Sequence, residues 1–123
     1  MNFLAAAEIN NQPLLLLLDS GNANHGNLNK VFFEQNKEFL TSHCQSNIVR
    51  QGGVGGTWST ACYTLPDAKL TLGNNSVTIP EITVLTEEPG NGNVSDNCLG
   101  LKSMMLFKKL RFNLVDMTLS SEL

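Results

Sequence analysis

The sequence feature that most constrains the fold is a run of five leucines, Leu14 to Leu18, which follows Pro13 and ends at Asp19. The run is far shorter than the roughly 20 apolar residues that a membrane-spanning helix needs. It is also too apolar for a strand with one face in water, and it therefore predicts a strand that is buried on both faces. Because the strand ends in an aspartate, an ionisable carboxyl group lies at the rim of the hydrophobic core, where burial changes the pKa of a carboxyl group.

Three short motifs mark the chain, and each occurs once. The first is the Asp-Ser-Gly triplet at residues 19–21, directly after the leucine run. The second is the Gly-Gly-Val-Gly-Gly segment at residues 52–56, which is followed by Thr57 and Trp58. The third is the segment Asn-Cys-Leu-Gly-Leu-Lys-Ser-Met-Met at residues 97–105. Glycines at a hairpin tip let backbone amides approach a ligand with no side chain in between, so the second motif favours a ligand-covering loop.

The three motifs resemble those of the retropepsin-like aspartic proteases. The triplet resembles the active-site triplet of aspartic peptidases, and the glycine-rich segment resembles the flap of retroviral-type proteases. Segment 97–105 resembles that family's second signature, in which two apolar residues and a glycine lead into a short helix. The motifs stand in the family's order, and the resemblance covers nearly the whole chain, from Phe3 to the tail near Leu119. The chain is therefore identified as a single retropepsin-like domain spanning residues 1–123, similar to the domains of bacterial aspartyl protease-like proteins.

The resemblance implies a mostly β fold: a closed β-barrel that forms half of an acid protease, with a flap hairpin and one or two short helices. A two-lobed aspartic protease carries two copies of the triplet, whereas this chain has one copy and no internal repeat. Hydrolysis by paired carboxylates then requires the second aspartate to come from another copy of the chain. The implied function is that of an aspartic endopeptidase, a homodimer that cleaves peptide or protein substrates without a cofactor or a metal ion.

The resemblance also assigns roles to individual residues. Asp19 is the expected catalytic residue, which activates a water molecule. The expected support of the catalytic loop consists of Ser20, Gly21, Leu99 and Gly100. The residues expected to form the flap and to bind substrate are Gly53, Val54, Gly55, Gly56 and Trp58, with the residues near Leu85 as a further apolar wall.

Asn22 departs from the family pattern, in which Ala or Ser usually follows the triplet. An amide donor near the carboxylates would favour their ionised form and lower their pKa, which fits either a lower pH optimum or a loss of catalysis. Two alternative functions stay open: a catalytically inactive peptide-binding or dimerisation domain, and one half of a longer two-copy protein. For Asp19 taken alone, the alternative is an ordinary turn aspartate that caps its own backbone.

The hydrophobic pattern predicts the remaining elements. Residues 3–9 and the leucine run form a hairpin, residues 22–27 form a polar loop, and Asn29 caps a helix that extends to about Leu40. The apolar face of this helix is predicted to hold Val31, Phe32, Gln35 and Phe39. The other predictions are a flap hairpin over 48–65, a hairpin over 70–79 that turns at 73–76, a separate strand over 82–85 after Pro80, a surface loop over 87–96, a helix over 103–110 and an alternating tail to Leu119 with a break near Asp116.

Composition excludes several function classes. The chain has a net charge of -3 and only 8 lysines and arginines among 123 residues, which argues against nucleic acid as the partner.

We expect no signal peptide and no membrane segment in this chain; the compartment stays open, because a longer exported precursor is compatible with the sequence. Cys44, Cys62 and Cys98 fit neither a disulfide framework nor a zinc site, although a pairing of two of them stays open. His25 and His43 are expected to be solvated, and no metal site is expected.

Overall fold

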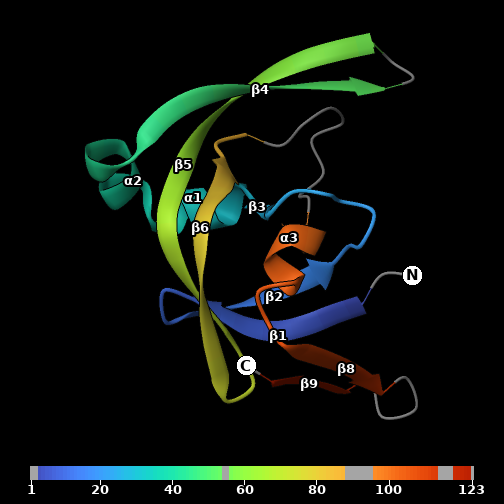
Figure 1. Cartoon of the computed structure of the whole chain (residues 1–123). Helices are drawn as coiled ribbons and strands as arrows, with labels where there is room; N and C mark the ends of the chain where they lie inside the picture. The colour runs from blue at the N-terminus through green and yellow to red at the C-terminus, as the bar shows by residue number, and fades with distance from the viewer. Residues whose placement is uncertain (1–2, 54–55, 88–95, 114–117, 123) are drawn as a thin grey trace.

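The computed structural model describes residues 3–53, 56–87, 96–113 and 118–122 (Figure 1). No helix in this part of the chain is long and apolar enough to cross a membrane. The strands are β1 (Phe3–Ile9), β2 (Gln12–Leu18), β3 (Gly26–Leu28), β4 (Gln45–Gly53), β5 (Gly56–Leu72), β6 (Asn75–Leu85), β7 (Asn97–Leu99), β8 (Lys109–Asn113) and β9 (Thr118–Glu122). The helices are α1 (Lys30–Gln35), α2 (Lys37–His43) and α3 (Leu101–Met104). The predicted mostly β class is confirmed.

Six of the strands close into a barrel. They pair in the order β1-β2-β7-β3-β6-β5, and the ring closes where Glu8 and Ile9 of β1 pair with Thr71 and Leu70 of β5. β4 pairs with β5 outside the ring, so the β4–β5 hairpin projects away from the barrel (Figure 1). The closed barrel that the sequence motifs implied is therefore confirmed.

The prediction that the leucine run is buried on both faces is wrong. In β2 the run alternates: Leu16 and Leu18 are buried, whereas Leu15 is 59% exposed. On the paired strand β1, the outward-facing Leu4 is 52% exposed. A barrel is one sheet closed on itself, so each strand has a single inner face, and successive side chains point to opposite faces. Only every second leucine of the run therefore reaches the core.

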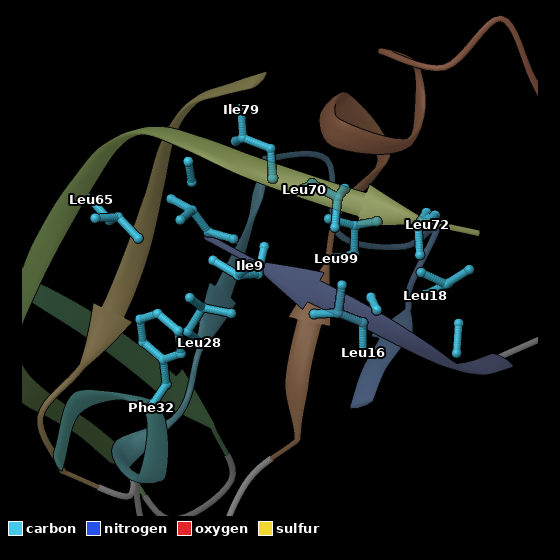
Figure 2. Packing of buried hydrophobic residues seen from close by; sticks show 14 of the residues in the cluster. Ile9, Leu16, Leu18, Leu28, Phe32, Leu65, Leu70, Leu72, Ile79 and Leu99 are labelled. Atoms are coloured by element: carbon cyan, nitrogen blue, oxygen red, sulfur yellow. The ribbon is translucent and has the colours of Figure 1, made fainter. Parts of the chain in front are cut away.

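The core fills the inside of the barrel. Figure 2 shows inward-pointing side chains from several strands gathered in one cluster, together with Phe32 of α1. Burial of one such side chain contributes about 1.5–3 kcal/mol relative to an exposed position, so the cluster holds the strand ends in place. The labelled members are Ile9, Leu16, Leu18, Leu28, Phe32, Leu65, Leu70, Leu72, Ile79 and Leu99.

Asn36 divides the predicted single helix in two. Its backbone has φ −123° and ψ 19°, and its side-chain amide donates to the Phe32 carbonyl oxygen at 2.8 Å and to Gln12 Oε1 at 2.9 Å. α1 therefore ends before Asn36 and α2 begins after it. The predicted apolar face is wrong in part: Phe32 and Leu40 are buried, whereas Val31, Gln35 and Phe39 are exposed.

The predicted cap of the first helix is confirmed, and it leads to a testable expectation. The Asn29 side chain, which is buried, accepts a hydrogen bond from the Phe32 amide at 3.2 Å. We expect Asn29→Ala to lower the free energy of unfolding by about 1 kcal/mol, because an N-terminal amide of α1 loses its acceptor. Urea unfolding measures this change. Asn47→Ala is the matched control on exposed β4, with an expected change within about 0.5 kcal/mol; an equal loss in both variants would contradict the capping role.

Two hairpins follow the helices. β4 and β5 pair from Gln45 with Thr64 to Gly53 with Gly56, so the predicted long hairpin is confirmed in its arms. β5 and β6 are joined by a tight turn at residues 73–74, inside the predicted hairpin. The prediction of a separate strand after Pro80 is wrong, because β6 runs through it. The β5–β6 register is the same on both sides of Pro80. Proline has no amide hydrogen to donate to the neighbouring strand, but the pairing continues past it.

The C-terminal part of the chain differs from the predicted helix over residues 103–110. α3 begins directly after Gly100 and ends at Met104, and Lys109 already belongs to β8. Within residues 103–110, only Ser103 and Phe107 are buried, and Met105 is 71% exposed. The alternating tail forms the β8–β9 pair. The predicted break near Asp116 and the middle of the predicted surface loop, residues 88–95, lie outside the described residues.

Candidate functional site

Asp19 lies where β2 leaves the barrel. Its backbone amide donates to the Leu99 carbonyl oxygen of β7 at 3.0 Å, and its own carbonyl oxygen accepts the Asn22 amide at 3.1 Å. Leu18, directly before it, is buried in the core and pairs with Leu99. The aspartate is therefore fixed by the barrel on one side and by a tight turn on the other, and it is itself half-buried.

Two donors contact the Asp19 carboxylate within the described residues. The Gly21 amide donates to Oδ1 at 2.9 Å, and the Cys98 thiol donates to Oδ2 at 3.9 Å. A Cβ at Gly21 would come within 3.1 Å of Oδ1, so a glycine suits this close approach. Ser20 is exposed, and it borders an apolar cavity of about 430 Å³ together with Phe3, Leu18 and Leu101.

The segment that begins at Leu99 lies against the loop after Asp19. The Gly100 amide donates to the His25 carbonyl oxygen at 2.9 Å, and the Leu101 amide donates to the Asn22 carbonyl oxygen at 2.7 Å. A Cβ at Gly100 would lie 2.0 Å from the Asn24 carbonyl oxygen, so the two backbones are in direct contact there. The structure thus brings Leu99 and Gly100 together with the Asp19 loop.

Asn22 does not donate to the carboxylate of Asp19. Its Oδ1 accepts the Asn24 amide at 3.0 Å, and its Nδ2 donates to Cys98 Sγ at 3.9 Å. Burial, and next the negative charge of Asp19, raise the pKa of the Cys98 thiol, so that it stays protonated. The Asn22 side chain is therefore linked to the carboxylate through Cys98, a residue to which the sequence assigned no role at Asp19.

A cavity of about 330 Å³ lies beside this loop. Its walls come from the loop after Asp19, from β4 and from the facing strands β5 and β6. The cavity therefore joins the base of the β4–β5 hairpin to the Asp19 loop. The lining includes Asn22, Asn24, Val49, Thr64 and, as the sequence suggested for this wall, Leu85.

The residues expected to form the flap lie at the far end of the β4–β5 hairpin. Gly53 pairs with Gly56, and Trp58 pairs with Gln51. Val54 and Gly55, the expected tip, lie outside the described residues. Figure 1 shows this end of the hairpin extending well away from the barrel.

Comparison with known proteins bears on the fold. No family model matches the sequence, and no curated protein matches it. Among solved structures, the protein is similar to the EIAV protease complexed with the inhibitor HBY-793, at 19% sequence identity and a TM-score of 0.55. The alignment covers 85% of this chain and 86% of that chain. The chain has a retropepsin-like fold.

Within this retropepsin-like fold, His25 and Ser103 form a pair that sequence reasoning missed. Ser103 Oγ donates to the His25 carbonyl oxygen at 2.9 Å and lies 2.9 Å from His25 Nδ1. The Ser103 hydroxyl therefore contacts both the backbone and the ring of His25, and the tautomer of the ring decides which atom donates in the Nδ1–Oγ contact. The expectation of a solvated His25 is wrong, since the residue is half-buried; the burial of Ser103 inside a helix was the missing information.

Metal-ligating side chains do not cluster in the described part of this chain. No three His, Cys, Asp or Glu residues in it are close enough together to hold a metal ion. Cys44, Cys62 and Cys98 are free thiols. The pairing of two cysteines that the sequence left open is therefore not formed.

Proposed function

We propose that this chain is an aspartic endopeptidase that works as a homodimer and hydrolyses peptide bonds with a water nucleophile. The observation that carries the proposal is the Asp19 carboxylate, which the Gly21 amide holds at the end of a core strand; its neighbours Leu18 and Ser20 line one cavity, and Asn22 and Asn24 of the following loop line another. The retropepsin-like fold supports it, because the similar EIAV protease has the same architecture. No cofactor is needed for this chemistry.

Two copies of Asp19 divide the chemical work. Peptide hydrolysis needs a base that deprotonates the attacking water and an acid that protonates the departing nitrogen. Two carboxylates about 3 Å apart supply both, because like-charge repulsion keeps one protonated while the other is ionised. One chain supplies one such carboxylate, so the proposed active site is complete only in a dimer with twofold symmetry. In that dimer, Ser20 hydrogen-bonds across the axis and locks the two loops together.

Apolar surface next to the triplet supports this dimer. Leu101 and Met105 are exposed, and the cavity beside Ser20 is lined mainly by apolar side chains such as Phe3 and Met104. Exposed apolar groups clustered on one face are typical of an interface, and this cluster adjoins the Asp19 loop. Association through this face would bring the two triplets toward each other.

The substrate in this proposal is an extended peptide. Gly53 to Gly56 and Trp58 would cover it as a flap, and the peptide backbone would pair with the hairpin as an added strand. The cavity lined by Val49, Thr64 and Leu85 would take a substrate side chain. The EIAV protease was solved with an inhibitor bound, which supports a comparable ligand groove in this fold.

The experiment that tests the proposal is cleavage of a denatured protein substrate between pH 3 and pH 7. We expect cleavage at acidic to mildly acidic pH and inhibition by a statine-containing peptide, which imitates the tetrahedral transition state. Binding of that peptide without cleavage would instead select the inactive peptide-binding domain. A protein that stays monomeric and inactive at high concentration would select one half of a longer two-copy protein.

The dimer requirement gives a second testable expectation. Below the dissociation constant of the dimer, the initial rate should rise with the square of the protein concentration, because each active site needs two chains. Above it, the rate should rise in direct proportion. Sedimentation equilibrium on the same samples measures the dissociation constant independently. A strictly linear dependence in samples that sediment as monomers would contradict the shared active site.

A further inference from the structure

Three side chains form a hydrogen-bonded chain that ends on Asp19. The Asn24 amide donates to Asn22 Oδ1 at 3.0 Å, Asn22 Nδ2 donates to Cys98 Sγ at 3.9 Å, and the Cys98 thiol donates to Asp19 Oδ2 at 3.9 Å. The first contact fixes the orientation of the Asn22 amide, so that its nitrogen faces the sulfur. The three successive hydrogen bonds therefore run in one direction, toward the carboxylate.

The central residue of this chain, Cys98, is held on two sides. It is the middle residue of β7 and pairs with Leu17 of β2 and with Asn27 of β3. The sulfur is therefore anchored by the barrel and not by the loop that carries Asp19. The thiol is half-buried, and its burial and the neighbouring carboxylates raise its pKa, which keeps the S–H hydrogen in place for donation.

The two oxygens of Asp19 have different donors. Oδ1 accepts a backbone amide at 2.9 Å, whereas Oδ2 accepts the thiol at 3.9 Å. A thiol is a weak donor, so Oδ2 can still share a proton or contact a water molecule. If the thiol were absent, the carboxylate would keep one fixed oxygen and would turn more freely about its last bond.

We propose that Cys98 is a positioning residue for Asp19: its thiol holds Oδ2 and so fixes the plane of the carboxylate. The inference rests on the proposed peptidase function for its catalytic meaning, but the effect on the carboxylate exists without substrate. It also gives Asn22 a role, since the Asn22 amide orients the thiol and does not act on Asp19 directly.

Several charged groups surround this arrangement. Asp19, at the end of β2, and Asp96, just before β7, are the carboxylates that act on the thiol. His25 and Lys102 line the neighbouring cavity, and the Nδ1 atom of His25 is bonded to Ser103. Substitution of Cys98 by an uncharged residue leaves all of these groups in place, so a change at Asp19 reports the loss of the thiol.

The test is ¹³C NMR of the Asp19 side chain at one pH, with kcat and KM of cleavage beside it. In Cys98→Val the carboxylate loses its second donor, so the chemical shift of the Asp19 carboxyl carbon should change and the order parameter of its Cβ should fall. Because one hydrogen bond contributes about 1 kcal/mol, kcat should fall about 5-fold, while KM stays nearly constant since the thiol contacts the carboxylate and not the substrate. Cys98→Ser, which restores a hydroxyl donor, should bring the order parameter and kcat part of the way back.

Cys44→Val is the matched control. Cys44 is also partly buried, with a thiol pKa raised by burial, but it lies at the end of α2 and is not among the described residues that donate to the Asp19 carboxylate. Cys44→Val should leave the NMR signals of the Asp19 side chain and kcat unchanged. An Asp19 side chain with the same chemical shift and order parameter in Cys98→Val as in the unmodified protein would overturn the inference, even if cleavage persists. A protein that cleaves nothing but shows the change at Asp19 would overturn the peptidase function and keep the inference. If Cys98→Val fails to fold, Cys98→Ala takes its place.

Discussion

Asp19→Asn should reduce peptide cleavage at least about 1,000-fold, which is the largest effect expected of any single substitution in this protein. In the proposed homodimer the change occurs in both subunits, so it removes the base and the acid together. The amide is nearly the same size as the carboxyl group, and Oδ1 can still accept the Gly21 amide, so the fold should be kept. Initial rates on a denatured protein substrate, at equal dimer concentration, measure the loss.

Asp67→Asn is the control for this substitution. Asp67 lies in β5 with a positive φ of 50°, a conformation that asparagine also tolerates, and it is exposed. Its replacement changes the net charge by the same amount without touching the site. We expect its activity to match that of the unmodified protein. Undiminished cleavage by Asp19→Asn would remove the paired-carboxylate mechanism from consideration.

The fold could be predicted from sequence where the signal was local. The Asp-Ser-Gly triplet follows an apolar strand, the glycine-rich segment lies between two strand patterns, and Asn29 stands before a helical pattern. Each of these features depends on a few adjacent residues. The resemblance to a family added the long-range placement of Leu99 and Gly100 beside the Asp19 loop, which no local pattern contains.

The errors arose where tertiary contacts overrode the local pattern. Five consecutive leucines suggested two buried faces, but ring closure gives β2 one inner face. The residues around Asn36 have a helical pattern. Asn36 nevertheless separates α1 from α2, because its side chain forms a hydrogen bond with Gln12 on β2. The apolar residues after Met104 suggested a longer helix, although most of them face solvent or the cavity beside Ser20.

The contacts of Cys98 could not be predicted from sequence. Asp19 and Cys98 are 79 positions apart, and the cysteine looked like one of three unrelated thiols. The one available signal was its place next to Leu99 in the second signature. β7 pairs in parallel with β2 and ends at Leu99, beside Asp19. Cys98, the residue before Leu99, therefore lies close to the carboxylate.

Gly100→Ala should have the largest effect on stability, a loss of at least about 3 kcal/mol in the free energy of unfolding. The backbone of Gly100 is extended, with φ −86°, so the cost is not conformational. It comes from space: the new Cβ would lie 2.0 Å from the Asn24 carbonyl oxygen, and relief requires one of the two backbones to move. Such a movement weakens the hydrogen bonds from Gly100 to His25 and from Leu101 to Asn22, which hold the Asp19 loop.

Gly73→Ala separates this steric effect from the general cost of replacing a glycine. Gly73 has a φ of 62°, but an added Cβ meets nothing nearer than Ser121 Oγ at 4.0 Å. Only the strained backbone conformation opposes the substitution, and it costs about 1 kcal/mol. Urea unfolding should therefore rank Gly100→Ala as much less stable than Gly73→Ala, and cleavage should be lost in the first variant alone. Equal stabilities would show that the loop and the start of α3 are not in the close contact on which the placement of Asp19 depends.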